Sequence, residues 1–320
     1  MGFLKSLFSG NAQQNTENDK QKNIQKKFDI FKYDGMRAQR AGQIDFAIKF
    51  FTEAIALQKD FETMNYLSQA YIQKGELDDA GELLQEMLEL EPEHTETYLV
   101  LANINFMQEK YEDMGRYAKK VIELQKENAS AHYLLGKSEH YLKNDIMAIA
   151  SLTQAIQLKN NYIEALLLRA DILISLNQYK EAAEDVDLIL NENAEDEAAL
   201  LLHGQIQEAT GNGEEAEKDY LYVIELNPFN EQAFLKLGKY FTDKGEASKA
   251  IELYNEAVEL NPNFTQAYHE RGRAKLISGD KDGSIEDLKK ALELDPKGNE
   301  NLTGKFENSE VKPETIPGIF

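Results

Sequence analysis

The segments Glu225-Leu226-Asn227-Pro228, Glu259-Leu260-Asn261-Pro262 and Glu293-Leu294-Asp295-Pro296 repeat one pattern, with their prolines 34 residues apart. Counting back from Pro228 in the same steps reaches Pro92, which closes a further copy, Glu89-Leu90-Glu91-Pro92. A fixed period of this length indicates stacked copies of one supersecondary unit rather than a single globular core. The sequence therefore predicts an array, and its function has to be sought on a surface.

The 34-residue period divides residues 28–298 into eight repeats, which begin at residues 28, 61, 95, 129, 163, 197, 231 and 265. Position eight is small in every repeat: Gly35, Ser68, Ala102, Gly136, Ala170, Gly204, Gly238 and Gly272. Position 20 is small in all but one: Ala47, Ala80, Met114, Ala148, Ala182, Ala216, Ala250 and Ser284. Small residues on either side of a turn let two antiparallel helices approach closely, so each repeat is predicted to be a helix pair.

The predicted turn lies at position 15, because residues that tolerate a left-handed conformation recur there. These residues are Gly42, Gly75, Asn177, Gly211, Gly245 and Gly279. Proline at position 32 is expected to end the second helix, since it lacks the N–H donor and clashes with the preceding turn. Lys126, Asn160 and Ala194 replace this proline in the third to fifth repeats, so we expect those repeats to be less regular.

These positions, together with a small or apolar residue at position 27, resemble the tetratricopeptide repeat. The position-27 residues are Ala54, Met87, Val121, Ala155, Ile189, Val223, Ala257 and Ala291. The resemblance implies an all-α fold: a right-handed superhelical solenoid of sixteen helices in antiparallel pairs. It also implies a concave face lined by the first helix of each pair.

Both ends of the chain differ from the array. Residues 1–27 are expected to form a flexible arm with a short apolar patch, from which a helix capped by Thr16 or Asn18 runs into the first repeat. Residues 299–320 are expected to be a poorly ordered tail of polar and apolar residues. Either this tail or a second copy of the chain would cover the apolar flank of the last helix, which carries Ile285, Leu288 and Leu292.

Charge and composition limit the partners and the compartment. The chain has 57 Asp and Glu against 35 Lys and Arg, a net charge of -22. Residues 1–60 hold ten basic and seven acidic residues, so the acidic excess lies in the array, and we expect no nucleic-acid partner. Without cysteine, without an apolar run of about 20 residues and with Lys5 interrupting the start, the chain is predicted to be cytoplasmic.

The sequence contains no recognisable catalytic or metal-binding motif. The five histidines form no His-Glu-x-x-His motif, and His132 and His203 fall at positions where packing residues normally lie. Acidic pairs such as Asp78-Asp79 occupy the starts of second helices, where they favour the helix dipole. We therefore expect no enzyme activity, no cofactor and no metal.

The remaining candidate site is the concave face, where the family pattern places positions two, five, nine and twelve of each first helix. From these positions the sequence selects a groove lined by Asn103, Phe106, Tyr133, Lys137, His140, Leu167, Asp171, Ile174, Gln205, Lys239, His269 and Arg273. Apolar and aromatic side chains with one polar residue per repeat suit an extended or helical peptide. Lys239, His269 and Arg273 could receive an acidic end of that peptide.

The sequence therefore predicts a non-enzymatic scaffold or adaptor that binds a protein or peptide segment in this groove. The alternative is a weak membrane-surface tether, in which the N-terminal patch docks on anionic lipid. That patch consists of Phe3, Leu4, Leu7 and Phe8, assisted by Lys5, Lys22, Lys26 and Lys27. The oligomeric state is left open by the sequence.

Overall fold

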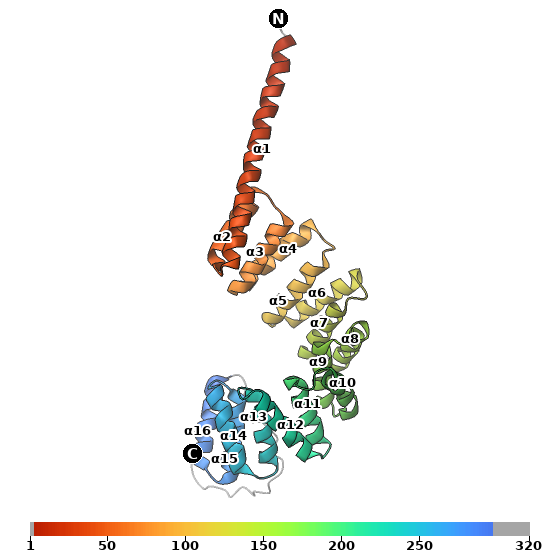
Figure 1. Ribbon diagram of the computed structural model, residues 1–320, viewed down its shortest axis with the longest axis vertical. Coiled ribbons are helices and arrows are strands. Elements are labelled where there is room, and N and C mark those ends of the chain that lie inside the picture. The colour runs from red at the N-terminus through yellow and green to blue at the C-terminus, as the bar shows by residue number, and fades with distance from the viewer. Residues whose placement is uncertain (1–2, 297–320) are drawn as a thin grey trace, which may run out of the picture. The chain divides into compact units, whose positions relative to one another are not determined.

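The computed structural model describes residues 3–296, with side chains from residue 19 onward, and this part of the chain is all helical (Figure 1). It contains sixteen helices, as the period predicts. The first helices of the eight pairs are α1 (Phe3–Arg40), α3 (Phe61–Lys74), α5 (Thr95–Met107), α7 (Ala129–Tyr141), α9 (Ile163–Ser175), α11 (Glu197–Ala209), α13 (Glu231–Asp243) and α15 (Thr265–Ser278). The second helices are α2 (Ile44–Leu57), α4 (Leu77–Leu90), α6 (Tyr111–Leu124), α8 (Asp145–Leu158), α10 (Tyr179–Glu192), α12 (Gly213–Leu226), α14 (Ala247–Leu260) and α16 (Lys281–Leu294).

The chain divides into two compact blocks, here called the N-terminal block (Met1–Ile172) and the C-terminal block (Leu173–Phe320). The boundary falls inside α9. Within each block, the helices that pack together are first or second neighbours along the chain. Each block is therefore a stack of antiparallel helix pairs with an apolar core that continues from one repeat to the next.

The small residues at positions eight and 20 bring the two helices of a pair together, as predicted. Ala148 and Ala216 are completely buried, and so are Tyr220 and Tyr254 at position 24. A Cβ atom built on Gly204 would lie 2.5 Å from the ring of Tyr220, so the glycine is required by the large side chain opposite it.

The turn at position 15 is left-handed in all eight repeats. The predicted glycines and Asn177 have φ between 59° and 94°. The same conformation occurs at Glu109 (φ 58°) and Lys143 (φ 65°), where the sequence gives no such signal. A side chain with a Cβ is strained in this region by roughly 1 kcal/mol, so these two repeats keep the turn at a cost in stability.

Replacing Glu109 with glycine is therefore expected to stabilise the N-terminal block by about 0.5–1 kcal/mol in urea denaturation. Gly245→Ala is the matched control, and it is expected to destabilise the protein. The added Cβ would meet nothing within 4 Å, so only the backbone strain changes. Stabilisation by both substitutions would show that backbone conformation does not decide the outcome.

The helices also end regularly where proline is missing. In the third to fifth repeats the second helices stop at Leu124, Leu158 and Glu192, two residues before Lys126, Asn160 and Ala194. Helices with proline, such as α4 and α12, stop at the same distance from it. The expected irregularity is thus wrong: the next helix begins at the same register in every repeat, frequently with a side-chain cap such as Asn128 on the N–H of Ala131.

The N-terminal arm is largely described by the structure, whereas the C-terminal tail is not. Helix α1 begins at Phe3, so helix continues through most of the predicted arm, and neither Thr16 nor Asn18 caps it. Residues 11–27 contain no glycine or proline, so a helix nucleated in the first repeat can propagate through them. The side chains of the predicted membrane patch and the tail 299–320 lie outside what is described, although Ile285 and Leu292 of α16 are exposed.

Candidate functional site

In the N-terminal block, four predicted groove residues lie on α5 and α7: Phe106, Tyr133, Lys137 and His140. The Nζ atom of Lys137 lies 3.5 Å from the centre of the Phe106 ring. His140 pairs through Nδ1 with Asp145 Oδ1 at 2.8 Å. Tyr133 packs on Tyr162 with ring centres 5.1 Å apart, and burial raises the pKa of Tyr133.

The other predicted residues of this block contribute less. The Asn103 amide donates to the Leu99 carbonyl of its own helix at 2.9 Å, so this donor is already satisfied. Leu167 is half-buried and Asp171 is exposed on α9.

In the C-terminal block, a cavity of about 340 Å³ opens on the side formed by the first helices. Its lining contains Ile174, Gln205, Glu208, Ala209, Gln232, Leu235, Lys236, Lys239, Gln266 and Glu270, with Tyr179 and Tyr220 from second helices. Three of the twelve predicted residues, Ile174, Gln205 and Lys239, thus line one cavity. Its volume falls within the range of ligand pockets.

Several lining residues were not selected from the sequence. Glu208, Gln232 and Gln266 occupy positions twelve, two and two, so the family pattern contains a signal for them. Lys236 and Glu270 are at position six, and the two tyrosines belong to the opposite helix of the pair. No signal in the repeat pattern marks these, because side-chain reach into the cavity depends on packing between repeats.

Three glutamines give this cavity its polar character. Gln205, Gln232 and Gln266 come from the consecutive first helices α11, α13 and α15. Within the described residues, no other protein group hydrogen-bonds their amides. Each amide offers both a carbonyl acceptor and an NH₂ donor, which matches the groups of a peptide main chain.

Two carboxylates of different character flank the glutamines. Burial raises the pKa of Glu208, although the Tyr220 hydroxyl, which donates to Oε2 at 3.3 Å, and the charge of Lys239 oppose this shift. Burial acts against ionisation of Glu270 as well, but the hydrogen bond with His269 and nearby positive charges outweigh it and lower the pKa. The cavity therefore combines one carboxyl group whose pKa is raised by burial with one whose pKa is lowered by its partners.

The predicted cations His269 and Arg273 contact carboxylates of the same block. His269 Nδ1 lies 3.3 Å from Glu270 Oε1. Arg273 pairs with Asp243 at 3.3 Å and with Glu270 at 3.5 Å. Their charges are thus directed toward protein carboxylates, and Lys239 is the exposed cation of the cavity.

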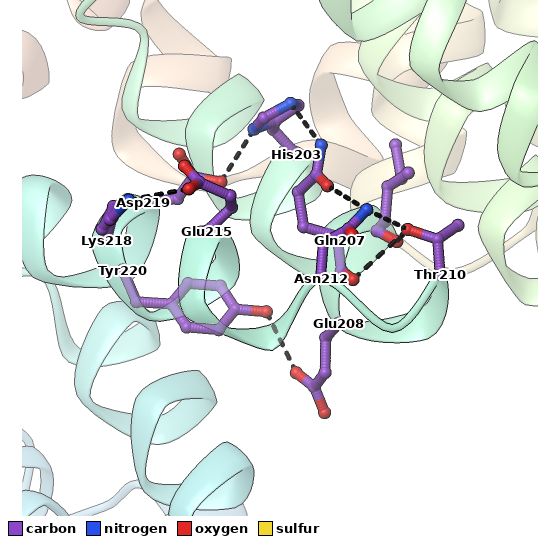
Figure 2. A network of polar contacts seen from close by, with 10 residues as sticks. His203, Gln207, Glu208, Thr210, Asn212, Glu215, Lys218, Asp219 and Tyr220 are labelled. Atoms are coloured by element: carbon purple, nitrogen blue, oxygen red, sulfur yellow. Dashed lines mark hydrogen bonds and ion pairs between the residues drawn. The ribbon is translucent and has the colours of Figure 1, made fainter.

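A polar network behind the cavity fixes the end of α11. Figure 2 shows His203 between Asp219 and Gln207, with the Tyr220 hydroxyl pointing toward Glu208. His203 Nδ1 lies 2.7 Å from Asp219 Oδ2, and Gln207 in turn accepts from Asn212 at 3.0 Å. His203, at a position where packing residues normally lie, is half-buried and linked to a carboxylate.

This network predicts a dependence of stability on pH. The hydrogen bond with Asp219 raises the pKa of His203 above its usual 6.5, partly against burial and with help from the charges of Asp219, Asp187 and Glu215. The stabilisation is complete below about pH 6.5 and is lost as the pH rises through the raised pKa. We expect the unfolding free energy to fall across this window, and to fall less in His203→Gln.

Urea denaturation at a series of pH values measures this difference. His132→Gln is the control, because His132 contacts the Lys126 carbonyl and pairs with no carboxylate among the described residues. If the unfolding free energy of His203→Gln depends on pH as that of the wild type does, the His203–Asp219 pair does not cause the dependence.

Neither a cluster of metal-binding side chains nor a membrane-spanning helix occurs in the described part of the chain. Between residues 19 and 296, no group of three His, Asp or Glu side chains could hold a metal ion. Among the described helices, none is both long enough and apolar enough to cross a membrane.

Family models agree with the repeat geometry. Models described as tetratricopeptide repeat match residues 38–104, 129–162, 167–231 and 265–297, and one described as TPR repeat matches 238–279. Together these matches cover more than half of the chain. The chain belongs to the tetratricopeptide repeat family. Among curated proteins, no sequence matches this tetratricopeptide repeat protein.

Solved structures support the tetratricopeptide repeat fold. A tetratricopeptide repeat protein from Parabacteroides merdae is similar with a TM-score of 0.68 and 21% identity, over 76% of this chain and 96% of that one. The APC/C hetero-tetramer Cut9-Hcn1 gives a TM-score of 0.61 and 15% identity, over 84% of this chain and 54% of that one. At these identities the likeness concerns the fold, and membership of the repeat family supports a protein-interaction scaffold of the kind that is typically not an enzyme.

Proposed function

We propose that the chain is a scaffold that holds a peptide segment of a partner protein on the concave face of its first helices. The observation that carries this proposal is the cavity of about 340 Å³ in the C-terminal block, into which three consecutive first helices each contribute a glutamine. The glutamine amides, which no group among the described residues satisfies, would pair with main-chain N–H and C=O groups of the peptide.

The rest of the lining suits the side chains of such a segment. Ile174 and Leu235 supply apolar surface, and the Tyr179 and Tyr220 rings close the side of the second helices. Main-chain hydrogen bonds give affinity to an extended peptide, while small apolar pockets select its side chains. Lys236 and Lys239 add basic side chains and Glu270 adds an acidic one, so a peptide segment that carries both charges would be favoured in one direction.

A peptide library displayed on phage and selected on the full-length chain tests this proposal. We expect the selected peptides to lose about tenfold or more in affinity for Gln205→Trp, because the larger side chain fills the cavity. Glu256→Trp adds the same ring at an exposed position of α14 outside the cavity and is the control. A library that yields no binder, or binders that both variants retain equally, would contradict the proposal.

A further inference from the structure

Lys137 on α7 is a half-buried cation. Within the part of the chain that the structure describes, no carboxylate pairs with its Nζ atom. Its contact is with the face of the Phe106 ring, 3.5 Å from the ring centre. Burial alone acts on its ionisation and lowers the pKa of Lys137.

Several other lysines of the same block, among them Lys59 and Lys74, are paired with carboxylates. Lys32, also on a first helix, contacts Asp60 at 3.0 Å and Glu62 at 2.6 Å. In a chain with 57 acidic residues, a half-buried lysine to which the described residues offer an aromatic face and no carboxylate is unusual. An aromatic face offsets part of the cost of removing an ammonium group from water, whereas a carboxylate would offset more.

An exposed aromatic surface adjoins this cation. Phe106 packs edge to face on Tyr141 with ring centres 5.2 Å apart, and Tyr141 stacks on Tyr111 at 4.7 Å. Tyr141 remains 41% exposed, and Met107, next to Phe106 in sequence, is 56% exposed. Exposed aromatic and methionine side chains are typical of protein-docking surfaces. We call Phe106, Met107, Tyr111 and Tyr141 the α5–α7 patch.

We propose that Lys137 and the α5–α7 patch form a docking site for a partner peptide that carries a carboxylate side chain next to an aromatic or large aliphatic one. The carboxylate pairs with Lys137, and the apolar neighbour packs on Tyr141 and Met107. His140 does not compete for this carboxylate, since it is already paired with Asp145. The inference rests on the proposed function, and it specifies the partner chemistry recognised by the N-terminal block.

The acidic component follows from charge complementarity. The chain as a whole has a net charge of -22 and would repel an acidic peptide at most positions. A peptide that binds here therefore needs the local lysine and the apolar contact together. This combination gives specificity, because an acidic peptide without the apolar residue and an apolar peptide without the acid each lose one component.

The test uses an array of immobilised octapeptides probed with the full-length chain. One set has Glu or Asp beside Phe, Tyr or Leu at the centre, and a matched set replaces each acid by its amide. We expect the acidic set to bind about tenfold more strongly than the amide set. Lys137→Met should remove this preference while keeping the length of the side chain.

Lys159→Met is the matched control, because Lys159 also lies over a tyrosine ring, Tyr162 at 4.3 Å, but is exposed and outside the patch. This variant should retain the full preference for acid over amide. Tyr141→Ser provides a second variant, which should weaken binding of both sets while leaving the ratio between them. Thermal melts of all three variants establish that the helices are intact.

Equal binding of the acidic and amide sets by the wild type, or an unchanged preference in Lys137→Met, would overturn the inference. The same measurements distinguish failure of this inference from failure of the proposed function. If binding is sensitive to Gln205→Trp and insensitive to Lys137→Met, the cavity of the C-terminal block is a peptide site and the Lys137 site is not. If neither substitution affects any binder, both proposals are wrong.

Discussion

Gly136→Leu is expected to lower the free energy of unfolding by about 3 kcal/mol, the upper part of the usual range for overpacking. A Cβ at this position would lie 2.7 Å from Leu152 Cγ and 3.1 Å from the Ala148 carbonyl oxygen. The second of these is backbone, which cannot rotate away. The α7–α8 pair must therefore separate, and contacts with the repeats on either side weaken.

Urea denaturation with hydrogen exchange measures both the size and the place of this effect. Gly81→Leu is the control, because Gly81 also lies within a helix but its Cβ would meet nothing within 4 Å. Exchange should accelerate in α7 and α8 of Gly136→Leu and remain unchanged in α15 and α16. Equal destabilisation by both substitutions would mean that helix approach does not require a glycine at position eight.

Asp287→Asn is expected to lower the free energy of unfolding of the last repeat by about 3 kcal/mol, because it breaks the ion pairs of a buried carboxylate. Asp287 is 4% exposed and accepts from Arg271 Nε at 2.8 Å and from Arg271 Nη2 at 2.6 Å. Lys275 Nζ lies 2.8 Å from the same carboxylate. The neutral amide leaves two cations of α15 without their anion.

The effect of this substitution depends on pH in a defined direction. Burial alone would raise the pKa of Asp287, but the hydrogen bonds and charges of Arg271 and Lys275 outweigh it and lower the pKa below the usual 3.8. The stabilisation is present above about pH 3.8 and is lost as the pH falls through the lowered pKa. The difference between wild type and Asp287→Asn should therefore shrink in strong acid.

An exposed pair provides the comparison for this measurement. Asp113 contacts Arg116 at 2.9 Å on the surface of α6, and Asp113→Asn is expected to change stability by about 0.5 kcal/mol or less. Similar losses in the two variants would mean that burial of Asp287 does not strengthen its pairing.

Much of the architecture could be predicted from the sequence, because it depends on contacts that repeat. The small residues at positions eight and 20 set the helix pairing, and the glycines at position 15 set the turn. The left-handed Glu109 and Lys143 could not be predicted, since their conformation is imposed by the two helices that they join. The replacement of proline by Lys126 suggested an irregularity that the packing of the following repeat prevents.

The sequence predicts which face of the first helices carries the candidate site, but it predicts only some of the residues that line it. Ile174, Gln205 and Lys239 were selected by their positions and line one cavity. Tyr220 was not selected, because its contribution depends on how deeply a second-helix side chain reaches between first helices. Conversely, the Asn103 side chain was selected, but its amide donates a hydrogen bond to the Leu99 carbonyl of its own helix. This depends on the side-chain rotamer, which the repeat pattern does not specify.

The restriction of helix packing to near neighbours also determines how the chain acquires its fold. Since the contacts in each block join segments close in sequence, little loop-closure entropy opposes them, and low contact order is associated with rapid folding. The first repeats can form their pairs while later ones are still being synthesised. Folding can therefore advance along the chain during translation, with each completed repeat serving as the template for the next.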